Sequence, residues 1–473
     1  MTTSFSQGLL IPLLKKTTLD PTIAKNYRPI TISNTMSKIL ELYILDVSGH
    51  HDFCDLQFGF VAGRGTDMAT SMAHDVFSYC TRRGSPVYTC SLDAEGAFDA
   101  VPHDILFQKA INAVPDHFWR IMVNWYSSIT VRIKWNSQLS DTIMVCKGTR
   151  QGVLSSPFLF NLFYQDLITE LSEGIDGIKI NNLSYNVFCY ADDILLASLT
   201  VTGLQNMVDV ANRYITDHGL RFNPLKTECV SFGQNYFDPT PVWNLNDVKL
   251  KNSDKVNYLG VTLANKPNVH IHERISACRR AYYAMQGAGF SNVTANVNML
   301  SYIWEAAIRS VLTYGTSSVS ISKKSLADME RLQTKLLKAG LGLHKFCRSS
   351  PIMSALNIKK IESTIEIRSL DLIRSILCNS SRARPFYSHV LNQHICGKLN
   401  GHTDLIARVK VTCKKYDISF MKYIFDTSYS QSVRNDLKKM YTVEDGVTDS
   451  VRQLLLRHDP YSRVLLNLLL RAF

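Results

Sequence analysis

The chain has 473 residues, of which 45% are hydrophobic and 19% are charged. That balance excludes an intrinsically disordered protein, and the length allows about three structural units with sizeable cores. Lysine and arginine number 52 against 40 acidic residues, which gives a net charge of +12. A charge of this sign suits a phosphate-backbone partner, although anionic membranes and acidic proteins attract it as well.

The cysteine pattern and the apolar stretches exclude several other classes. The 11 cysteines include no C-x-x-C pair, which argues against a zinc module or a disulfide framework and favours a reducing intracellular compartment, either nucleus or cytoplasm. The N-terminal residues lack the order of a secretory signal. The longest uncharged stretch, residues 281–304, is interrupted by glycine, glutamine and asparagine, so we expect no membrane partner.

Residues 85–100 predict a strand followed by a turn and a helix. The apolar, β-prone run ends at Asp93, and Gly96 provides the turn. This places a carboxylate at a strand end. Residues 157–173 have apolar positions at helical spacing after an initial proline, so they predict a helix fed by the preceding loop.

Residues 186–199 predict a hairpin with an acidic turn. Asp192 and Asp193 lie between two apolar, β-prone runs, a pattern that is costly unless a cation neutralises it. A helix over 203–218 and a strand over 229–233 follow. We therefore expect an α+β fold in this part of the chain.

Beyond these segments the pattern changes to long helices. A short strand pair ends at residues 258–263, and from about residue 270 helical spacing dominates, for example over 275–287 and 324–342. The C-terminal region is therefore expected to be mostly helical.

Three aspartates form a candidate metal site. Asp192 and Asp193 occupy a hairpin turn, and Asp93 ends a strand 99 residues earlier. Magnesium prefers hard oxygen ligands and needs only a few carboxylates, and two such ions can support phosphoryl transfer. Taken alone, an Asp-Asp pair is more often a solvated turn.

Several blocks surround these aspartates in a characteristic order. They are LLIPLLKK, NYRPITISNTMSKILE, QFGFVAGRGTDMA, SLDAEGAFDAVPHDIL, GTRQGVLSSPFLFNLFYQDL, the YADD box at 190–193, GLRFNPLKTECVSFG and VNYLGVTL. Over roughly residues 9–265 they resemble the polymerase region of non-LTR (LINE-type) retrotransposon reverse transcriptases.

The resemblance implies an α+β fold of the right-hand polymerase type, with fingers, palm and thumb. We expect fingers and palm to be interleaved. The predicted regions are a fingers-like region at 1–90, a palm with a primer-grip-like hairpin at 91–265, a helical thumb-like region at 266–345 and a helical C-terminal region of unknown role at 346–473.

The resemblance also assigns the chemistry. Asp93, Asp192 and Asp193 would be the catalytic metal ligands, with two Mg²⁺ or Mn²⁺ ions as cofactors. Lys226 would lie near the pyrophosphate and act as general acid on the leaving group. A surface lysine after a proline turn is the alternative reading of Lys226.

In the same way, the resemblance assigns a nucleotide pocket. Phe98, five residues after the first aspartate, would lie under the sugar, where a bulky ring collides with a ribose 2′-hydroxyl and favours deoxynucleotides; a plain core position is the alternative. Gln151 and Gly152 would let the chain approach the base and sugar closely. Tyr190 of the YADD box belongs to the same pocket.

Basic residues of the fingers would hold the triphosphate. Arg28 is the best match, because a guanidinium binds phosphate through two parallel hydrogen bonds. Lys15 or Lys16 is a weaker match, with a solvated basic turn as the alternative.

Further residues are assigned to the nucleic acid. Arg64, between two glycines, would lie near a template sugar-phosphate backbone, although a plain glycine-rich turn is the alternative. Arg279 fits a thumb helix near the product duplex, with a solvated charged face as the alternative. The hairpin that grips the primer end would be supported by Tyr258, Leu259 and Gly260, and a plain core strand is the alternative.

The implied function is RNA-directed DNA polymerase activity, with an RNA template, a DNA primer or RNA–DNA hybrid and dNTPs as partners. We find no endonuclease in the sequence, so cleavage of a target would need a separate protein. Two alternatives remain. A domesticated remnant could bind nucleic acid without catalysis, although all three aspartates are intact, and an RNA-dependent RNA polymerase is disfavoured by Phe98 and by the YADD box.

Overall fold

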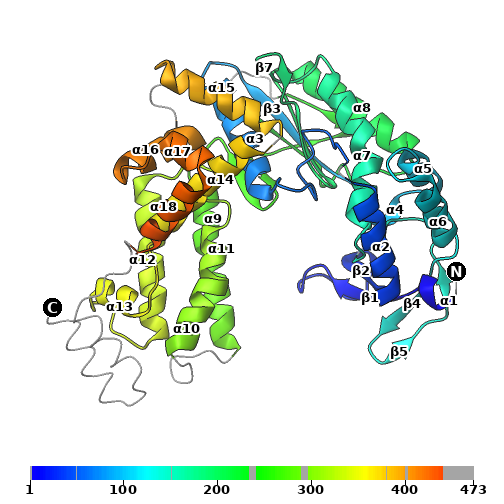
Figure 1. Cartoon of the computed structure of the whole chain (residues 1–473), viewed down its shortest axis with the longest axis horizontal. Helices are drawn as coiled ribbons and strands as arrows, with labels where there is room; N and C mark the ends of the chain where they lie inside the picture. Colours follow the sequence, from blue (N-terminus) through cyan, green and yellow to red (C-terminus); the bar gives the residue numbers. More distant parts are fainter. Residues whose placement is uncertain are drawn as a thin grey trace. The chain divides into compact units, whose positions relative to one another are not determined.

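The computed structural model describes residues 3–49, 51–150, 152–233, 241–288, 297–379, 381–399 and 403–439. Figure 1 shows its helices and strands. The described residues pack as two compact units: the first is drawn from Met1–Ala69 and Cys80–Val256, and the second from Thr70–Tyr79 and Asn257–Phe473. Each unit is described by itself below.

A mixed sheet forms the centre of the first unit. Its strands lie in the order β14-β11-β3-β10-β9, with bounds Lys251–Asn252, Glu228–Phe232, Val87–Asp93, Asp193–Ser198 and Val187–Tyr190. The middle strand β3 pairs antiparallel with β10 and with β11. Most residues of β3 and β10 are buried.

Two long helices of the first unit pack against this sheet (Figure 1). Helix α7, Ser156–Glu173, begins with a proline in its first turn and contacts β9. Helix α8, Val201–Asp217, contacts β3 and β10, and the Thr200 side chain caps it by accepting from Gly203 N. Both helices therefore support the strands that carry the aspartates.

A second sheet of the first unit carries the N-terminal basic residues. Strands β1 (Gln7–Leu14) and β2 (Tyr27–Ile32) are antiparallel, and β1 pairs in parallel with β4 (Thr130–Trp135). Its short strands β5 and β6 are Gln138–Leu139 and Ile143–Met144.

The remaining elements of the first unit are short pairs of strands and connecting helices. The short strands β7, β8, β12 and β13 are Lys179–Ile180, Leu183–Ser184, Asn244–Leu245 and Val248–Lys249. The helices α1, η1, α2, α4, α5 and α6 are Thr3–Ser6, Ala24–Asn26, Thr35–Val47, Ala97–Ala100, His103–Ala110 and Asp116–Tyr126.

The second unit is helical after one hairpin. Strand β15, Lys255–Tyr258, crosses the unit boundary and pairs with β16, Val261–Ala264. The helices α9, α10, η2, α11, α12 and α13 are Val269–Gly287, Val297–Ile303, Trp304–Ile308, Arg309–Thr313, Lys323–Gly340 and Ser349–Ala355. Helices α14 to α18 are Ile361–Cys378, Ala383–Ile395, Leu405–Lys415, Phe420–Phe425 and Thr427–Lys439.

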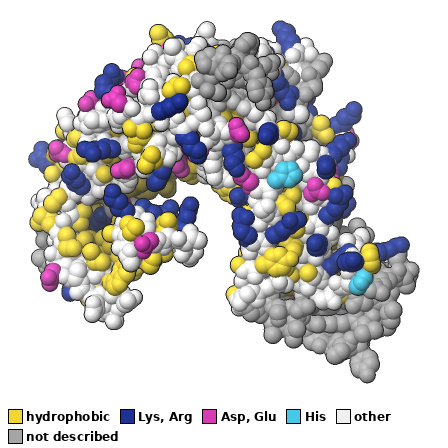
Figure 2. All heavy atoms as spheres, turned by 180° about the vertical axis from the view of Figure 1, so that it is seen from behind, with side chains coloured by type: hydrophobic (Ala, Val, Ile, Leu, Met, Phe, Trp, Pro, Cys, Tyr) yellow, Lys and Arg dark blue, Asp and Glu magenta, His cyan; other side chains and the backbone are white. Residues whose placement is uncertain are grey.

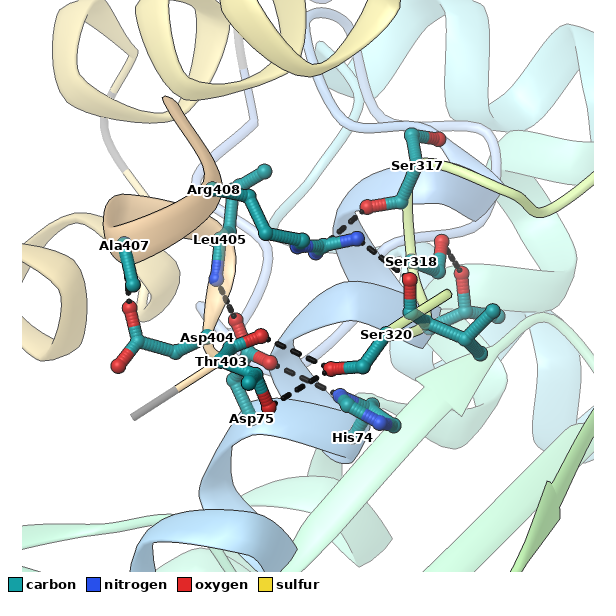
Figure 3. Close-up of polar contacts among 12 residues, drawn as sticks. His74, Asp75, Ser317, Ser318, Ser320, Thr403, Asp404, Leu405, Ala407 and Arg408 are labelled. Atoms are coloured by element: carbon teal, nitrogen blue, oxygen red, sulfur yellow. Dashed lines mark hydrogen bonds and ion pairs between the residues drawn. The ribbon is translucent and has the colours of Figure 1, made fainter. Parts of the chain in front are cut away.

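Helix α3, Thr66–Thr81, contributes its middle to the second unit, where a buried carboxylate holds it. Asp75 is 1% exposed and accepts hydrogen bonds from the Leu405 backbone and from the His74 ring, each at 2.9 Å (Figure 3). Burial alone would raise the pKa of Asp75, yet these hydrogen bonds and the charge of Arg408 lower it. The ionised carboxylate thus joins α3 to the start of α16.

The architecture confirms the expected α+β fold with a mostly helical C-terminal region, since every described element after β16 is a helix. The predicted region boundaries at residues 90, 265 and 345 stay predictions. Within the described ranges, no helix is both long and apolar enough to span a membrane.

Candidate active site

The three aspartates meet at one end of the central sheet of the first unit. Asp93 is the last residue of β3 and Asp193 is the first residue of β10, and the antiparallel register makes them direct partners. Asp192 precedes Asp193 in the turn between β9 and β10. The structure therefore brings together all three carboxylates that the sequence singled out.

A strained turn holds Asp192 and Asp193. Ala191 has a φ of +56°, a backbone angle that residues other than glycine rarely adopt. Its backbone N donates to Gln57 Oε1 at 3.1 Å, and the same oxygen accepts from Gly59 N at 2.8 Å. Gln57 is fully buried, so its amide fixes the turn to a distant segment. Sequence reasoning missed this residue, although it begins the QFGF block.

Burial and repulsion between the carboxylates raise the pKa of Asp192 and Asp193. Partial loss of solvation, followed by repulsion from Asp192 and Asp93, raises the pKa of Asp193 to about 6. Loss of solvation and the charge of Asp93 also raise the pKa of Asp192, whereas the charge of Arg28 opposes this shift. Concentrated negative charge at a strand end is what a bound cation would relieve.

Lys226 lies beside the first aspartate. Its Nζ is 3.3 Å from Asp93 Oδ2, and both side chains are well exposed. The Asp93 backbone is fixed from the same segment, because its carbonyl accepts from Asn223 N at 2.8 Å. Lys226 therefore lies within reach of Asp93, and its predicted role near the pyrophosphate stays a prediction.

The donor set suits a hard divalent ion, but the side chains are not gathered around one point. Three carboxylates at a strand end and a turn supply oxygen ligands of the type that Mg²⁺ and Mn²⁺ prefer. In the described part of the chain, no group of three or more acidic, histidine or cysteine side chains is arranged as a finished metal site.

Phe98 lies in an aromatic stack beside this site. It follows Gly96, whose φ of +56° makes the turn expected from the sequence, on the short helix α4. Its ring stacks on Phe160 of α7 with centroids 3.9 Å apart, and its carbonyl accepts from Thr149 N at 2.7 Å. The side chain is half-buried, so it has both a firm support and a surface open to a ligand.

The loop before α7 rests on a buried ion pair that sequence reasoning missed. Glu41 is 1% exposed, and its carboxylate accepts from Leu154 N at 2.9 Å and from Ser155 Oγ at 3.1 Å. Arg150, 5% exposed, lies 3.6 Å from the same carboxylate. Burial raises the pKa of Glu41, against the opposing hydrogen bond from Leu154 and the charge of Arg150.

Glycine is required in this loop. Gly152 has a φ of +99°, and a Cβ there would lie 3.0 Å from Thr31 O of β2. The backbone at Gly152 thus lies close to β2, and its approach to a base and sugar stays a prediction. Gln151 lies outside the described residues.

The basic residues of the first unit have different environments. Arg28 is exposed on β2, opposite Leu13 of β1, and its charge acts on Asp192. Lys15 Nζ donates to Lys25 O at 2.9 Å, and Lys16 is exposed. Of the three, Arg28 is the one whose charge reaches the aspartates. Figure 2 shows Lys and Arg side chains spread widely over the face in view, in keeping with the net positive charge.

Arg64 has internal partners. Its side chain is only 8% exposed, and its guanidinium donates to Cys54 O at 2.8 Å and Gln57 O at 2.7 Å and pairs with Asp55. The arginine therefore stabilises the loop that begins with Gln57. Its contact with a nucleic-acid backbone stays a prediction.

The predicted primer-grip and thumb residues lie in the second unit. Leu259 and Gly260 have φ values of +50° and +75° and form the tight turn of the β15–β16 hairpin. Tyr258 is 2% exposed, and Leu259 O accepts from Tyr314 Oη at 2.8 Å. Arg279 is exposed on α9. Their roles on nucleic acid stay predictions.

Comparisons with known proteins identify the family of this chain. The family described as Reverse transcriptase (RNA-dependent DNA polymerase) matches residues 14–263, over half of the chain. The RNA-directed DNA polymerase from mobile element jockey of Drosophila melanogaster is 25% identical over 375 residues, which cover 75% of this chain and 40% of that protein. The Retrovirus-related Pol polyprotein from type-1 retrotransposable element R2 of Popillia japonica is 25% identical over 337 residues, covering 67% of this chain and 45% of that protein.

The chain spans less than half the length of these two relatives. Among solved structures, apo telomerase from Candida Tropicalis is similar with a TM-score of 0.41 and 9% identity, covering 93% of this chain and 70% of that one. A likeness this weak carries no argument. The family match at residues 14–263 covers the sequence blocks from which the resemblance was inferred, except the first five residues of the first one, and it confirms the resemblance. The chain belongs to the reverse transcriptase (RNA-dependent DNA polymerase) family.

Proposed function

We propose that the chain is an RNA-directed DNA polymerase of retrotransposon origin, which adds dNTPs to a primer 3′-hydroxyl. The observation that carries the proposal is the register pairing of Asp93 with Asp193, with Asp192 beside them in the turn. This arrangement supports phosphoryl transfer because three carboxylates, two on paired strands and one in the adjoining turn, can bind ions jointly. RNA template, DNA primer and dNTPs are the proposed partners, with a separate endonuclease for target cleavage.

Asp93, Asp192 and Asp193 would hold two Mg²⁺ or Mn²⁺ ions, which would activate the primer hydroxyl and stabilise charge on the triphosphate oxygens. The chain's own residues then position the substrate. Arg28 binds the triphosphate, since its exposed guanidinium already acts electrostatically on Asp192.

Lys226 serves as the general acid in this proposal. Its ammonium is held 3.3 Å from Asp93 and is exposed, so it can turn toward a leaving pyrophosphate and give up a proton. Phe98 selects the sugar, because its ring is supported from behind by Phe160 and cannot easily yield to a 2′-hydroxyl.

Primer extension tests the proposed function. Native protein should incorporate dNTPs on a primed RNA template in Mg²⁺ and should discriminate against rNTPs. The double variant Asp192→Asn with Asp193→Asn should lose incorporation and keep RNA binding. The matched control is Asp141→Asn with Asp217→Asn, which removes two exposed aspartates of the same unit and should extend like the native protein.

Two results would contradict the proposal. If the double variant extends the primer as well as the native protein does, the assignment of the three aspartates to the active site is wrong. Native protein that is folded and binds RNA but incorporates no dNTP would favour the alternative in which the chain only binds nucleic acid.

A further inference from the structure

Phe60 has a backbone conformation that large side chains rarely adopt. Its φ is +56°, and 56% of the residue is exposed. A bulky residue at positive φ is strained, and such strain persists only where the surrounding contacts hold it in place. Neither burial nor turn propensity accounts for a phenylalanine here.

The residues just before this phenylalanine are held against the β9–β10 hairpin, which carries Asp192 and Asp193, and against helix α7. Phe58 N donates to Cys189 O at 2.8 Å, and Asn161 Nδ2 donates to Gly59 O at 2.8 Å. A Cβ on Gly59 would lie 2.5 Å from Ala191 N, so the two backbones are in direct contact. These contacts fix the backbone immediately before Phe60.

The exposed ring of Phe60 lies beside the two aromatic residues of the proposed nucleotide pocket. Its centroid is 6.5 Å from that of Phe98, with the planes at 83°, and 6.3 Å from that of Tyr190, with the planes at 46°. Such tilted and edge-on contacts set the orientation of a ring. Phe60 therefore extends the pocket with an apolar surface of fixed orientation.

We propose that Phe60 is a nucleotide-binding contact for the nascent base pair. Its ring packs against the base and sugar of the incoming deoxynucleotide once that nucleotide has paired with the template. The inference rests on the proposed function. Aromatic rings stack on any nucleobase, because every base has a π face, so the contact favours a correctly placed pair without preferring one base.

Phe60→Gly removes the ring and leaves the backbone conformation unchanged, so it tests the contribution of the ring alone. Glycine adopts a φ of +56° without strain, so this variant should fold at least as well as the native protein. Phe60→Trp keeps an aromatic surface. The matched control is Asn136→Gly, which relieves a φ of +53° at an exposed turn between β4 and β5 and removes no ring.

The experiment measures binding without turnover. The protein is bound to a primed RNA template whose primer ends in a dideoxynucleotide, and the dissociation constants of the next complementary dNTP and of the matching rNTP are measured in Mg²⁺. The affinity for the primed template alone is measured in parallel. Phe60→Gly should weaken dNTP binding roughly tenfold, as loss of a base–aromatic stack predicts. Phe60→Trp should retain the dNTP affinity of the native protein, and so should Asn136→Gly.

Three outcomes would overturn the inference. Unchanged dNTP affinity in Phe60→Gly would exclude the contact. Weaker binding of the primed template with unchanged dNTP affinity would place the ring on the template instead. If only the selectivity for dNTP over rNTP changes, Phe60 acts by supporting the Phe98 ring and does not contact the base pair itself.

The binding measurement also separates this inference from the proposed function. Native protein that binds the matched dNTP but never extends an ordinary primer would contradict polymerase activity, and the Phe60 comparison would still decide the contact. Native protein that forms no such ternary complex would contradict both.

Discussion

Asp93 and Asp193 face each other as partners across the β3–β10 pair, and Asp192 adjoins Asp193 in the turn. Directly opposed side chains in an antiparallel pair have Cβ atoms roughly 4.5–5.5 Å apart, so like charges there repel. The fold thus keeps a locally unfavourable arrangement at the site where ions are proposed to bind. Strain of this kind is characteristic of functional sites.

Replacing one carboxylate should therefore stabilise the fold while removing activity. In metal-free buffer at pH 8, Asp193→Asn should raise the free energy of unfolding by on the order of 1 kcal/mol, less than the full pKa shift implies because the side chain is exposed. Urea denaturation measures the stability, and primer extension should be lost. Asp217→Asn, exposed on α8, should change neither; a destabilised Asp193→Asn would contradict the repulsion.

The same carboxylate predicts a pH dependence of stability. The pKa of Asp193 is raised to about 6 in the folded protein, so its protonated form favours folding. That contribution is fully present below about pH 4, the pKa of an unfolded aspartate, and is lost as the pH rises through about 6. The stability gap between Asp193→Asn and native protein should open between pH 4 and pH 7. Mg²⁺ should narrow the gap above pH 6, because the ion needs the ionised carboxylate.

Lys226 provides a test of proton transfer. If its ammonium gives a proton to the leaving group, Lys226→Gln should lower kcat roughly 100-fold and remove the alkaline limb of the pH–rate profile. Lys226→Arg should keep the ion pair with Asp93 without serving as an efficient acid. Lys251→Gln, which breaks an exposed pair with Glu228, is the matched control and should leave kcat unchanged. If the pH–rate profile of Lys226→Gln matches that of the native protein, Lys226 is a surface lysine with no role in proton transfer.

Phe98 provides a test of sugar selection. Phe98→Ala should lower the ratio of kcat/KM for dNTP over rNTP roughly tenfold, because the obstacle to a 2′-hydroxyl is gone. The variant should also lose about 2 kcal/mol of stability, since a half-buried ring stacked on Phe160 is removed. Phe98→Tyr keeps the ring and should retain the selectivity. Equal ratios in Phe98→Ala and native protein would assign the ring to packing alone.

The Glu41–Arg150 pair should be far more sensitive than an exposed pair. Glu41→Ala leaves a buried guanidinium without its counter-charge and leaves Leu154 N without its acceptor, which should cost about 3–5 kcal/mol. Asp116→Ala, which breaks an exposed pair with Arg120, should cost less than about 1 kcal/mol. Thermal unfolding compares the two, and similar losses would contradict the structural role of the buried pair.

Local sequence patterns predicted the elements that carry the site. The apolar run ending at Asp93 became β3, the proline-initiated segment became α7, and the apolar runs around the YADD box became β9 and β10. Gly96 makes the expected turn with a positive φ. These features depend on the chain's own periodicity and turn chemistry, so neighbouring residues are sufficient to predict them.

The sequence by itself determined which residues are available for catalysis and in which order. Only the tertiary structure decided how they are held. Gln57 bonds to Ala191 from 134 positions away, Lys226 meets Asp93 across 133 positions, and Glu41 meets Leu154 across 113. Arg64, expected at a nucleic-acid backbone, makes internal hydrogen bonds. Such partners are chosen by packing and by the need to satisfy buried polar groups, and neither leaves a periodic trace in the sequence.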